Sequence, residues 1–314
     1  MLAHLVGHFF QGNLEQALQK ALGLIKGAYA TAVIAKDDPG KIVVARLSAP
    51  LAIARNKRGV LIASDPSAII SHSKKITFLK DGEMATITNN GFTVTDLKNH
   101  KKEMVATNID WKVKEAEKRG WPHFMLKEIM EQPKSITNAL RGRLLIKKGT
   151  VKLGGLENIK KRLVNINRVQ LIACGSASYA GKFGEYLIEE LAGIPTRSDV
   201  ASEFRYRNQV LDKNLLSIFI SQSGETADTL AALKIVKESG GLAIGVVNVV
   251  GSTLARDVGF GIYNHSGPEI AVATTKAFTS QLVILVLIAL FLGRQRKLSL
   301  DAGKTVVKEL HLLP

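Results

Sequence analysis

The stretch LLSIFISQSGET, residues 215–226, decides the fold. Its first half is apolar apart from one serine and lacks the polar alternation of a half-exposed strand, which indicates a strand buried on both faces. Its second half is small and rich in hydroxyl groups, and it leads into a helical pattern that we expect over Glu225–Ser239. A buried strand, a small turn and a helix form the unit of a doubly wound α/β sheet.

The same unit recurs on both sides of this stretch. The other apolar strands are VQLIAC at 169–174, LAIGVVNV at 242–249 and FGIYNHS at 260–266. The helical segments that follow them extend to Leu191, over GSTLARDV at 251–258 and over TTKAFTSQLVILVLIALFLGR at 274–294. We therefore expect residues 158–314 to form an α/β domain with a doubly wound parallel sheet.

The earlier part of the chain follows another pattern. Residues 1–105 contain short alternating or β-branched runs at 29–34, 41–45, 60–63, 75–79, 84–87 and 92–94. Turn-forming residues separate these runs, which predicts an antiparallel α+β domain with one preceding helix, Leu14–Ile25. Residues 106–157 are predicted to form a charged helical linker that includes WKVKEAEKR at 111–119 and MLKEIMEQPKSITNALRGRL at 125–144.

Composition excludes several classes of protein. The 314 residues are 46% hydrophobic and 22% charged, which is typical of globular proteins. A single Cys excludes a disulfide framework and favours a reducing, cytoplasmic setting. The N-terminus lacks the pattern of a signal peptide, and the longest apolar run, 282–292, is too short for a membrane span, which needs about 20 residues. We expect a cytoplasmic protein without membrane association.

The net charge of +16 attracts polyanions and phosphorylated metabolites alike. Much of it lies in residues 101–168, which hold 17 Lys and Arg against 7 Asp and Glu. Few aromatic residues accompany these charges, so the segment resembles a solvated connection more than a groove that stacks bases. We expect no nucleic-acid partner.

Residues at the carboxyl ends of the strands are the candidates for binding, because ligands of doubly wound sheets bind there. Ser221, Gln222, Ser223 and Thr226 follow one strand, and Ser176 follows another. Hydroxyl groups at the start of a helix form a cradle for an anion such as phosphate. Ser in this position also caps helices, so spacing alone leaves anion binding and capping open.

Other candidates have simpler structural explanations. Cys174 could be a nucleophile, although a buried small side chain is the commoner role. Glu203 and Arg205 are expected near the end of a short strand as a structural ion pair. The segment EIAVATTKAF at 269–278 is interpreted as a Thr-capped helix start. His4 and His8 have helical spacing without the Glu of an HExxH motif, and no metal or cofactor is expected.

Four longer motifs resemble a known family. ACGSASYAG, ASEFRYR, SQSGETADTLAALK and EIAVATTKAFTSQL are similar to the first sugar-isomerase (SIS) lobe of the glutamine:fructose-6-phosphate amidotransferases, the isomerizing glucosamine-6-phosphate synthases. FMLKEIMEQP, GAYATAVIA, ARLSAPLAIA, ASDPSAI and FLKDGEMA resemble the linker and the later part of the glutaminase half, which is a layered domain of the N-terminal-nucleophile type. The resemblance covers nearly the whole chain.

The resemblance implies amino-sugar biosynthesis in two steps. Glutamine is hydrolysed in the glutaminase half, and its ammonia aminates fructose 6-phosphate, which becomes glucosamine 6-phosphate. Synthase halves of this family form homodimers. The positions that would hold the sugar phosphate, carried over from the family, are Ser176, Ser221, Gln222, Ser223 and Thr226, with Val272 and Thr274 lining the sugar.

The chain departs from the family at several points. It opens Met1-Leu2-Ala3 where the family has a nucleophilic Cys-Gly-Ile, and Ala177 replaces a hydroxyl-bearing residue of the first turn. The second SIS lobe, with its catalytic Glu and His, does not follow. We therefore expect a fragment that contains no catalytic residue and binds sugar phosphate without turnover on its own.

Two other functions remain open on sequence grounds. One is a non-catalytic SIS protein that binds a sugar phosphate and regulates a partner. The other is a stand-alone sugar-phosphate isomerase, for which the acid–base candidates near the crevice are Glu203, Glu225, Glu269 and His265.

Overall fold

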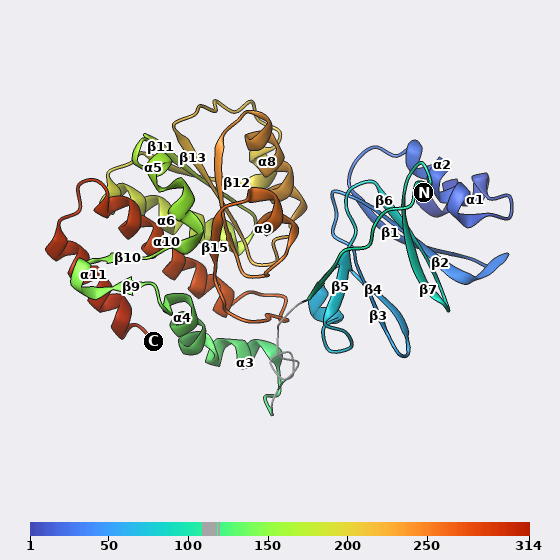
Figure 1. Ribbon diagram of the computed structural model, residues 1–314, viewed down its shortest axis with the longest axis horizontal. Coiled ribbons are helices and arrows are strands. Elements are labelled where there is room, and N and C mark those ends of the chain that lie inside the picture. Colours follow the sequence, from blue (N-terminus) through green and yellow to red (C-terminus); the bar gives the residue numbers. More distant parts are fainter. Residues whose placement is uncertain (109–117, 119) are drawn as a thin grey trace. The chain divides into compact units, whose positions relative to one another are not determined.

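The structure is a computed structural model that describes residues 1–108, 118 and 120–314. The chain divides into two compact units, Met1–Val113 and Lys114–Pro314 (Figure 1). The helix predicted over WKVKEAEKR, residues 111–119, lies outside the described residues except for Lys118. Each unit has its own hydrophobic core and is described separately.

The first unit contains two four-stranded sheets, and every pairing in them is antiparallel, as predicted. One sheet has the order β1-β2-β6-β7, with β1 (Tyr29–Ala35), β2 (Asp38–Leu47), β6 (Glu83–Thr88) and β7 (Gly91–Asp96). The other has the order β4-β3-β5-β8, with β3 (Ala52–Asn56), β4 (Gly59–Ala63), β5 (Lys75–Phe78) and β8 (Ala106–Asn108). A 3₁₀ turn, η1 (Pro66–Ala68), precedes β5.

The first unit has three layers: the two N-terminal helices, the sheet β1-β2-β6-β7 and the sheet β4-β3-β5-β8. Successive side chains of the middle sheet point to opposite faces and so pack against both outer layers. Val43 of β2 faces the helices α1 (Leu2–Phe9) and α2 (Leu14–Gly23), whereas Val44 faces the second sheet and packs with Ile53. The helix α2 begins where the side chain of Asn13 accepts a hydrogen bond from the amide of Gln16 at 2.9 Å. Only α2 was predicted, so the expectation of a single preceding helix is wrong.

The second unit is built on a five-stranded sheet in which all neighbours are parallel. Its order is β12-β11-β13-β14-β15, with β11 (Arg168–Ala173), β12 (Thr196–Val200), β13 (Leu215–Ser221), β14 (Leu242–Val247) and β15 (Gly261–Tyr263). The predicted parallel sheet is confirmed. After β11 the chain continues to β12 on one side of the sheet, and after β13 it continues to β14 on the other side. The strand order therefore reverses between the neighbours β11 and β13.

Helices cover both faces of this sheet, as its apolar strands require. On one face, Leu171 and Ile218 pack with α10 (Lys276–Arg294) and α6 (Ser176–Ala192). On the other, Ile172 and Phe219 pack in the core formed with α7 (Ala201–Phe204), α8 (Ala227–Glu238) and α9 (Thr253–Val258). Adjacent residues of one strand therefore serve two cores.

The helix α10 is the central element of the larger core. It is long and apolar enough to cross a membrane, but 78% of its most apolar window is buried inside the protein. Its contact with α6 is close: a Cβ on Gly293 would lie 2.5 Å from the carbonyl oxygen of Leu191. The helix predicted over 274–294 is confirmed, and it is longer than the run 282–292 alone indicated.

The segment predicted as a linker contributes to both units. Its β8 belongs to the first unit, whereas α3 (Phe124–Met130) and α4 (Gln132–Leu140) belong to the second, where α4 packs on α10. The other elements that the structure describes in the second unit are β9 (Leu144–Leu145), η3 (Ile146–Lys148), β10 (Thr150–Val151), η4 (Gly154–Ile159), α5 (Lys160–Val164) and α11 (Leu300–Leu312).

Candidate sugar-phosphate site

The point where the strand order reverses lies between the carboxyl ends of β11 and β13. Ser221 is the last residue of β13, and Ser176 is the first residue of α6, three positions after β11 ends. Ser176 is exposed, Ser221 is buried, and Gln222, Ser223 and Thr226 are partly exposed. The structure thus brings four of the predicted residues into one turn and the fifth to the neighbouring strand end.

Hydroxyl groups shape the turn from Ser221 to Thr226. The Ser221 Oγ accepts a hydrogen bond from the amide of Gly224 at 2.9 Å and lies 3.3 Å from the Thr226 Oγ1. The Ser223 Oγ accepts from the amide of Glu225 at 3.1 Å. The Ser223 hydroxyl therefore keeps its own proton for donation to a ligand, whereas the Ser221–Thr226 pair uses one of its two protons between the two oxygens and keeps the other. Fixing the turn and binding an anion are therefore compatible roles.

The start of the helix α9 packs against this turn and donates hydrogen bonds to it. Gly224 adopts a left-handed conformation with φ of 69°, and a Cβ there would lie 2.1 Å from the Oγ of the buried Ser252. The Gly224 carbonyl accepts from the amide of Leu254 at 2.9 Å, and the Glu225 Oε1 accepts from the amide of Thr253 at 2.8 Å. Position 224 consequently requires glycine for both its conformation and its space.

Asn248, which sequence reasoning missed, connects the turn to the loop after β15. Its amide donates to the carbonyl of Gln222 at 3.3 Å. Its side-chain Nδ2 donates to the Gly267 carbonyl at 2.7 Å, and its Oδ1 accepts from the amide of Ser266 at 2.9 Å. The sequence does contain one indication of this role, because Asn248 directly follows the buried strand β14 just as Gln222 directly follows β13.

The loop before α10 is organised by Glu269. One carboxylate oxygen accepts from the amides of Thr275 at 2.8 Å and Ala277 at 3.1 Å, and the other accepts from the hydroxyl of Thr274. Thr275, at the N-cap position, makes no side-chain capping bond. The expectation of a Thr-capped helix is therefore wrong: a carboxylate five to eight residues away stabilises the helix start.

Val272 and Thr274 lie in this same loop. The side chain of Val272 is fully exposed, and Thr274 is partly exposed. The contacts of Asn248 link the loop at Ser266 and Gly267 to the serine-rich turn. The predicted residues therefore come from three strand ends of one sheet edge.

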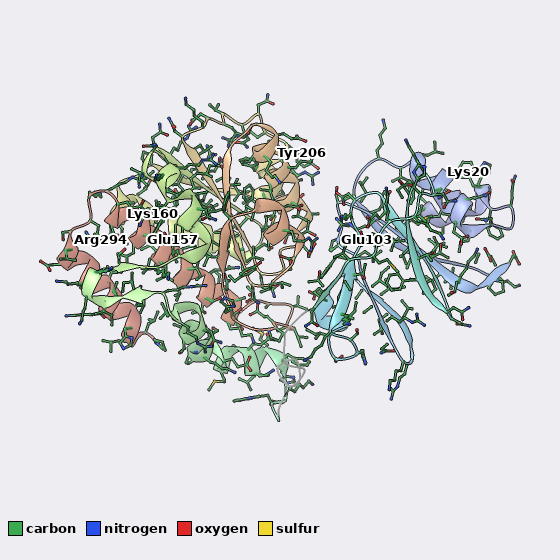
Figure 2. The ribbon with its side chains drawn as sticks, viewed as in Figure 1. Lys20, Glu103, Glu157, Lys160, Tyr206 and Arg294 are labelled. Atoms are coloured by element: carbon green, nitrogen blue, oxygen red, sulfur yellow. The ribbon has the colours of Figure 1, made fainter. Side chains whose placement is uncertain are left out.

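Two other expectations need correction or refinement. Glu203 lies in α7 and is exposed, and Arg205 pairs with Asp228 of α8 at 2.7 Å, so the expected ion pair between Glu203 and Arg205 is wrong. Arg205 also lies over the ring of the exposed Tyr206, labelled in Figure 2, at 4.9 Å from its centroid. Cys174 packs beside the core that contains Ile172, which suits a structural role.

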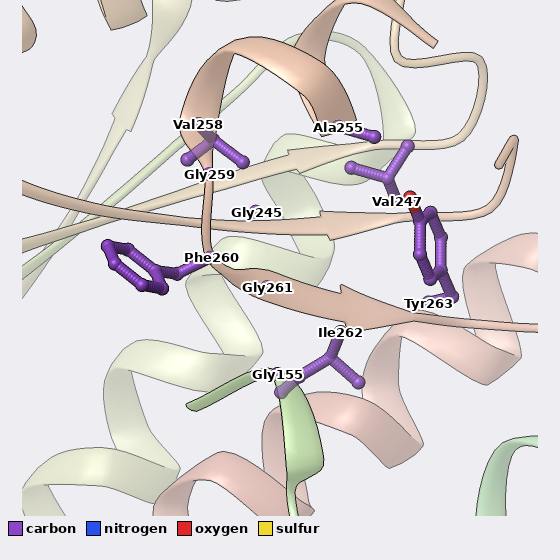
Figure 3. Close-up of a pocket in the computed structure, with 10 residues that line it drawn as sticks. All are labelled: Gly155, Gly245, Val247, Ala255, Val258, Gly259, Phe260, Gly261, Ile262 and Tyr263. Atoms are coloured by element: carbon purple, nitrogen blue, oxygen red, sulfur yellow. The ribbon is translucent and has the colours of Figure 1, made fainter. Parts of the chain in front are cut away.

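A cavity of about 200 Å³ lies elsewhere in the second unit, between β14, β15, α9 and η4 (Figure 3). Its lining is mostly glycine and apolar side chains, including Phe260 and Ile262. Such a lining offers few donors to a phosphate, so this cavity is not the predicted anion site. Within the described ranges, no three His, Cys, Asp or Glu side chains gather as metal ligands would.

Comparison with known proteins identifies relatives of both units. The SIS domain family matches residues 162–291. Glutamine–fructose-6-phosphate aminotransferase (isomerizing) of Chlorobaculum tepidum is 43% identical over 318 residues, covering 100% of this chain and 52% of the relative. The enzyme of the same name from a strain of Thermus thermophilus is 44% identical over 315 residues, covering 100% of this chain and 51% of the relative.

A solved structure supports the same relationship. The C-terminal domain of glucosamine-fructose-6-phosphate aminotransferase from Francisella tularensis superposes with a TM-score of 0.59 and 34% identity, covering 63% of this chain and 56% of that one. The chain spans about half the length of the curated relatives it matches. By sequence over its whole length and by the fold of its second unit, the chain belongs to the family of glutamine–fructose-6-phosphate aminotransferases.

Proposed function

We propose that the second unit binds the phosphate of fructose 6-phosphate and glucosamine 6-phosphate at the turn from Ser221 to Thr226. The observation that carries the proposal is the position of this turn, next to Ser176, where the strand order of the parallel sheet reverses. Ligands of doubly wound sheets bind at such a point. The names of the relatives supply the substrate class.

The chemistry of the turn suits a phosphate. The 12-residue helix α8 begins directly after Thr226, and its first amides carry the positive end of the helix dipole. Ser223 adds a hydroxyl donor at this helix start, and the hydrogen-bonded pair of Ser221 and Thr226 adds a second. Val272 and Thr274, on the loop linked through Asn248, would contact the sugar.

We further propose that these 314 residues bind the sugar phosphate without converting it. An isomerase needs a carboxylate or imidazole that is free to move a proton. Glu225 and Glu269 already accept hydrogen bonds from the backbone amides of Thr253, Thr275 and Ala277. Glu203 on α7 and His265 after β15 are exposed to solvent, so none of the four candidates is a buried base without backbone hydrogen bonds.

The last part of the proposal concerns the identity of the first unit and the oligomeric state of the chain. Residues 1–105 would be the later part of a glutaminase domain, 106–157 its linker and 158–314 the SIS domain, in a cytoplasmic protein. The layered antiparallel structure of the first unit supports the glutaminase assignment. A homodimer through the SIS domain follows from the family resemblance, and sedimentation velocity of the purified chain would test it.

Isothermal titration with fructose 6-phosphate tests the site. Ser223→Ala removes one hydroxyl donor and should weaken binding by about 1–3 kcal/mol, the contribution of a hydrogen bond to a charged group. Ser239→Ala is the matched control, because Ser239 follows α8 at the opposite edge of the sheet and its hydroxyl donates to the Val236 carbonyl. Equal affinities of the two variants would contradict the proposed site, and formation of glucosamine 6-phosphate from glutamine by the chain alone would contradict the absence of turnover.

A further inference from the structure

Glu128, on the helix α3, holds the loop that carries Val272. Its Oε1 accepts from the amide of Ile270 at 2.7 Å, and both oxygens lie 3.3 Å from the amide nitrogen of Ala271. The residues in contact are 142 and 143 positions apart in sequence. Figure 1 shows α3 at one end of the second unit, beside the loop that leads into α10.

The contact is buried and surrounded by charges. Glu128 is only 1% exposed, and desolvation raises the pKa of its carboxyl group even though two amides donate to it. Lys276, itself 2% exposed, pairs with Glu131 of the same α3–α4 segment at 2.6 Å. Glu269 and Lys276 both act electrostatically on Glu128. A buried carboxylate destabilises the folded state unless hydrogen bonds or a positive charge compensate for its lost hydration. The amides of the loop and the Lys276 ammonium provide compensation of this kind for Glu128.

The carboxylates of Glu128 and Glu269 accept hydrogen bonds from different parts of the same loop. Glu128 binds the amides of Ile270 and Ala271, and Glu269 binds those of Thr275 and Ala277. The stretch between these anchors contains Val272, whose side chain points fully into solvent. The loop is thus fixed at both ends and presents its middle outward.

We propose that Glu128 is a positioning residue for the sugar-binding loop, which it holds from the helix α3 through the amides of Ile270 and Ala271. The inference rests on the proposed function, because it concerns the same sugar-phosphate site. Binding groups reach full strength only when the residues behind them fix their geometry. Loss of the Glu128 carboxylate releases one end of the loop and moves Val272 and Thr274 from their binding positions.

The experiment combines titration with hydrogen exchange. Glu128→Ala should weaken binding of fructose 6-phosphate about tenfold, and it should accelerate exchange of the amides of Ile270 and Ala271. Glu128→Gln keeps one acceptor oxygen and should restore part of both properties. Glu157→Ala, which removes a carboxylate from an exposed position, is the matched control and should change neither.

The outcomes separate this inference from the proposed function. Unchanged affinity of Glu128→Ala, with Ser223→Ala still weakened, would overturn the positioning role and leave the site in place. Absence of binding by the wild-type chain would overturn both. If Glu128→Ala does not fold, exchange in the wild-type chain decides: fructose 6-phosphate should slow exchange at Ile270 and Ala271, and an unaltered rate would refute the coupling.

Discussion

Replacing Gly224 by Ala tests the geometry of the serine-rich turn. The new methyl group would meet three atoms: the Ser252 Oγ at 2.1 Å, the Ser252 Cβ at 2.6 Å and the Val247 Cγ1 at 2.9 Å. Ordinary contacts between carbon atoms lie at about 3.5–4.0 Å, so the turn has to move away from α9. Overpacking of this kind costs about 1–3 kcal/mol of the free energy of unfolding.

The left-handed backbone adds a second cost. Alanine at φ of 69° loses about 1–2 kcal/mol relative to glycine, which brings the expected total to about 2–5 kcal/mol. Gly240 separates the two contributions, because its φ is 73° and a Cβ there would meet no atom within 4 Å. Gly240→Ala should therefore show the backbone cost alone.

Urea unfolding followed by helical circular dichroism measures both variants. Gly224→Ala should be less stable than Gly240→Ala by about 1–3 kcal/mol, and it should bind fructose 6-phosphate more weakly. Ser252→Gly removes the two closest atoms and should recover more than half of that difference in the double variant. Equal destabilisation by the two alanines would refute the claim that the turn is packed against Ser252.

Two further predictions concern charged groups. The amide of His100, with Lys102 and the amide of Lys98, holds the pKa of Asp96 well below its usual range. Because the folded-state pKa is depressed, this stabilisation is present above about pH 4 and is lost as pH falls further. In Asp96→Asn, the free energy of unfolding of the first unit should therefore fall less steeply on acidification, and an unchanged slope in urea unfolding below about pH 4 would contradict this. In the second unit, Glu131→Ala leaves the buried Lys276 ammonium without its closest carboxylate and should cost about 3 kcal/mol in urea unfolding. Lys276→Met should cost less, since Glu131 is partly exposed to water; the reverse order would contradict this assignment.

Much of the fold could be predicted because its signals are local. The strands β11, β13 and β14 are mostly apolar, with only a few polar residues such as Gln170 and Ser217, and the small turns after them mark the sheet edge. By contrast, α1 contains His and Gly within a short apolar segment, and β3 directly follows a proline-containing stretch, so neither has a clear periodic pattern. Local patterns also gave no indication that α11 packs beside β10.

The candidate site was predictable only in part, for the same reason. Ser221, Ser223 and Thr226 form their turn within six residues, so sequence alone places them together. The partners of Glu128 and Asn248 are set by how distant elements pack, and sequence spacing carries no trace of them. The capping role of Glu269 was missed because Thr274 and Thr275, whose residue type suggests a cap, stand directly before the helix, whereas Glu269 lies six and eight residues before the amides that it accepts from.

The late position of α10 in the chain has a consequence for synthesis in the cell. During translation, Leu171, Ile218 and Ile244 emerge from the ribosome before the helix that covers them. At about 5–20 residues per second, the part of the sheet that α10 covers stays exposed for several seconds, with α6 but not α10 on that face. The growing polypeptide should accordingly be a client of holding chaperones until residue 294 has left the exit tunnel.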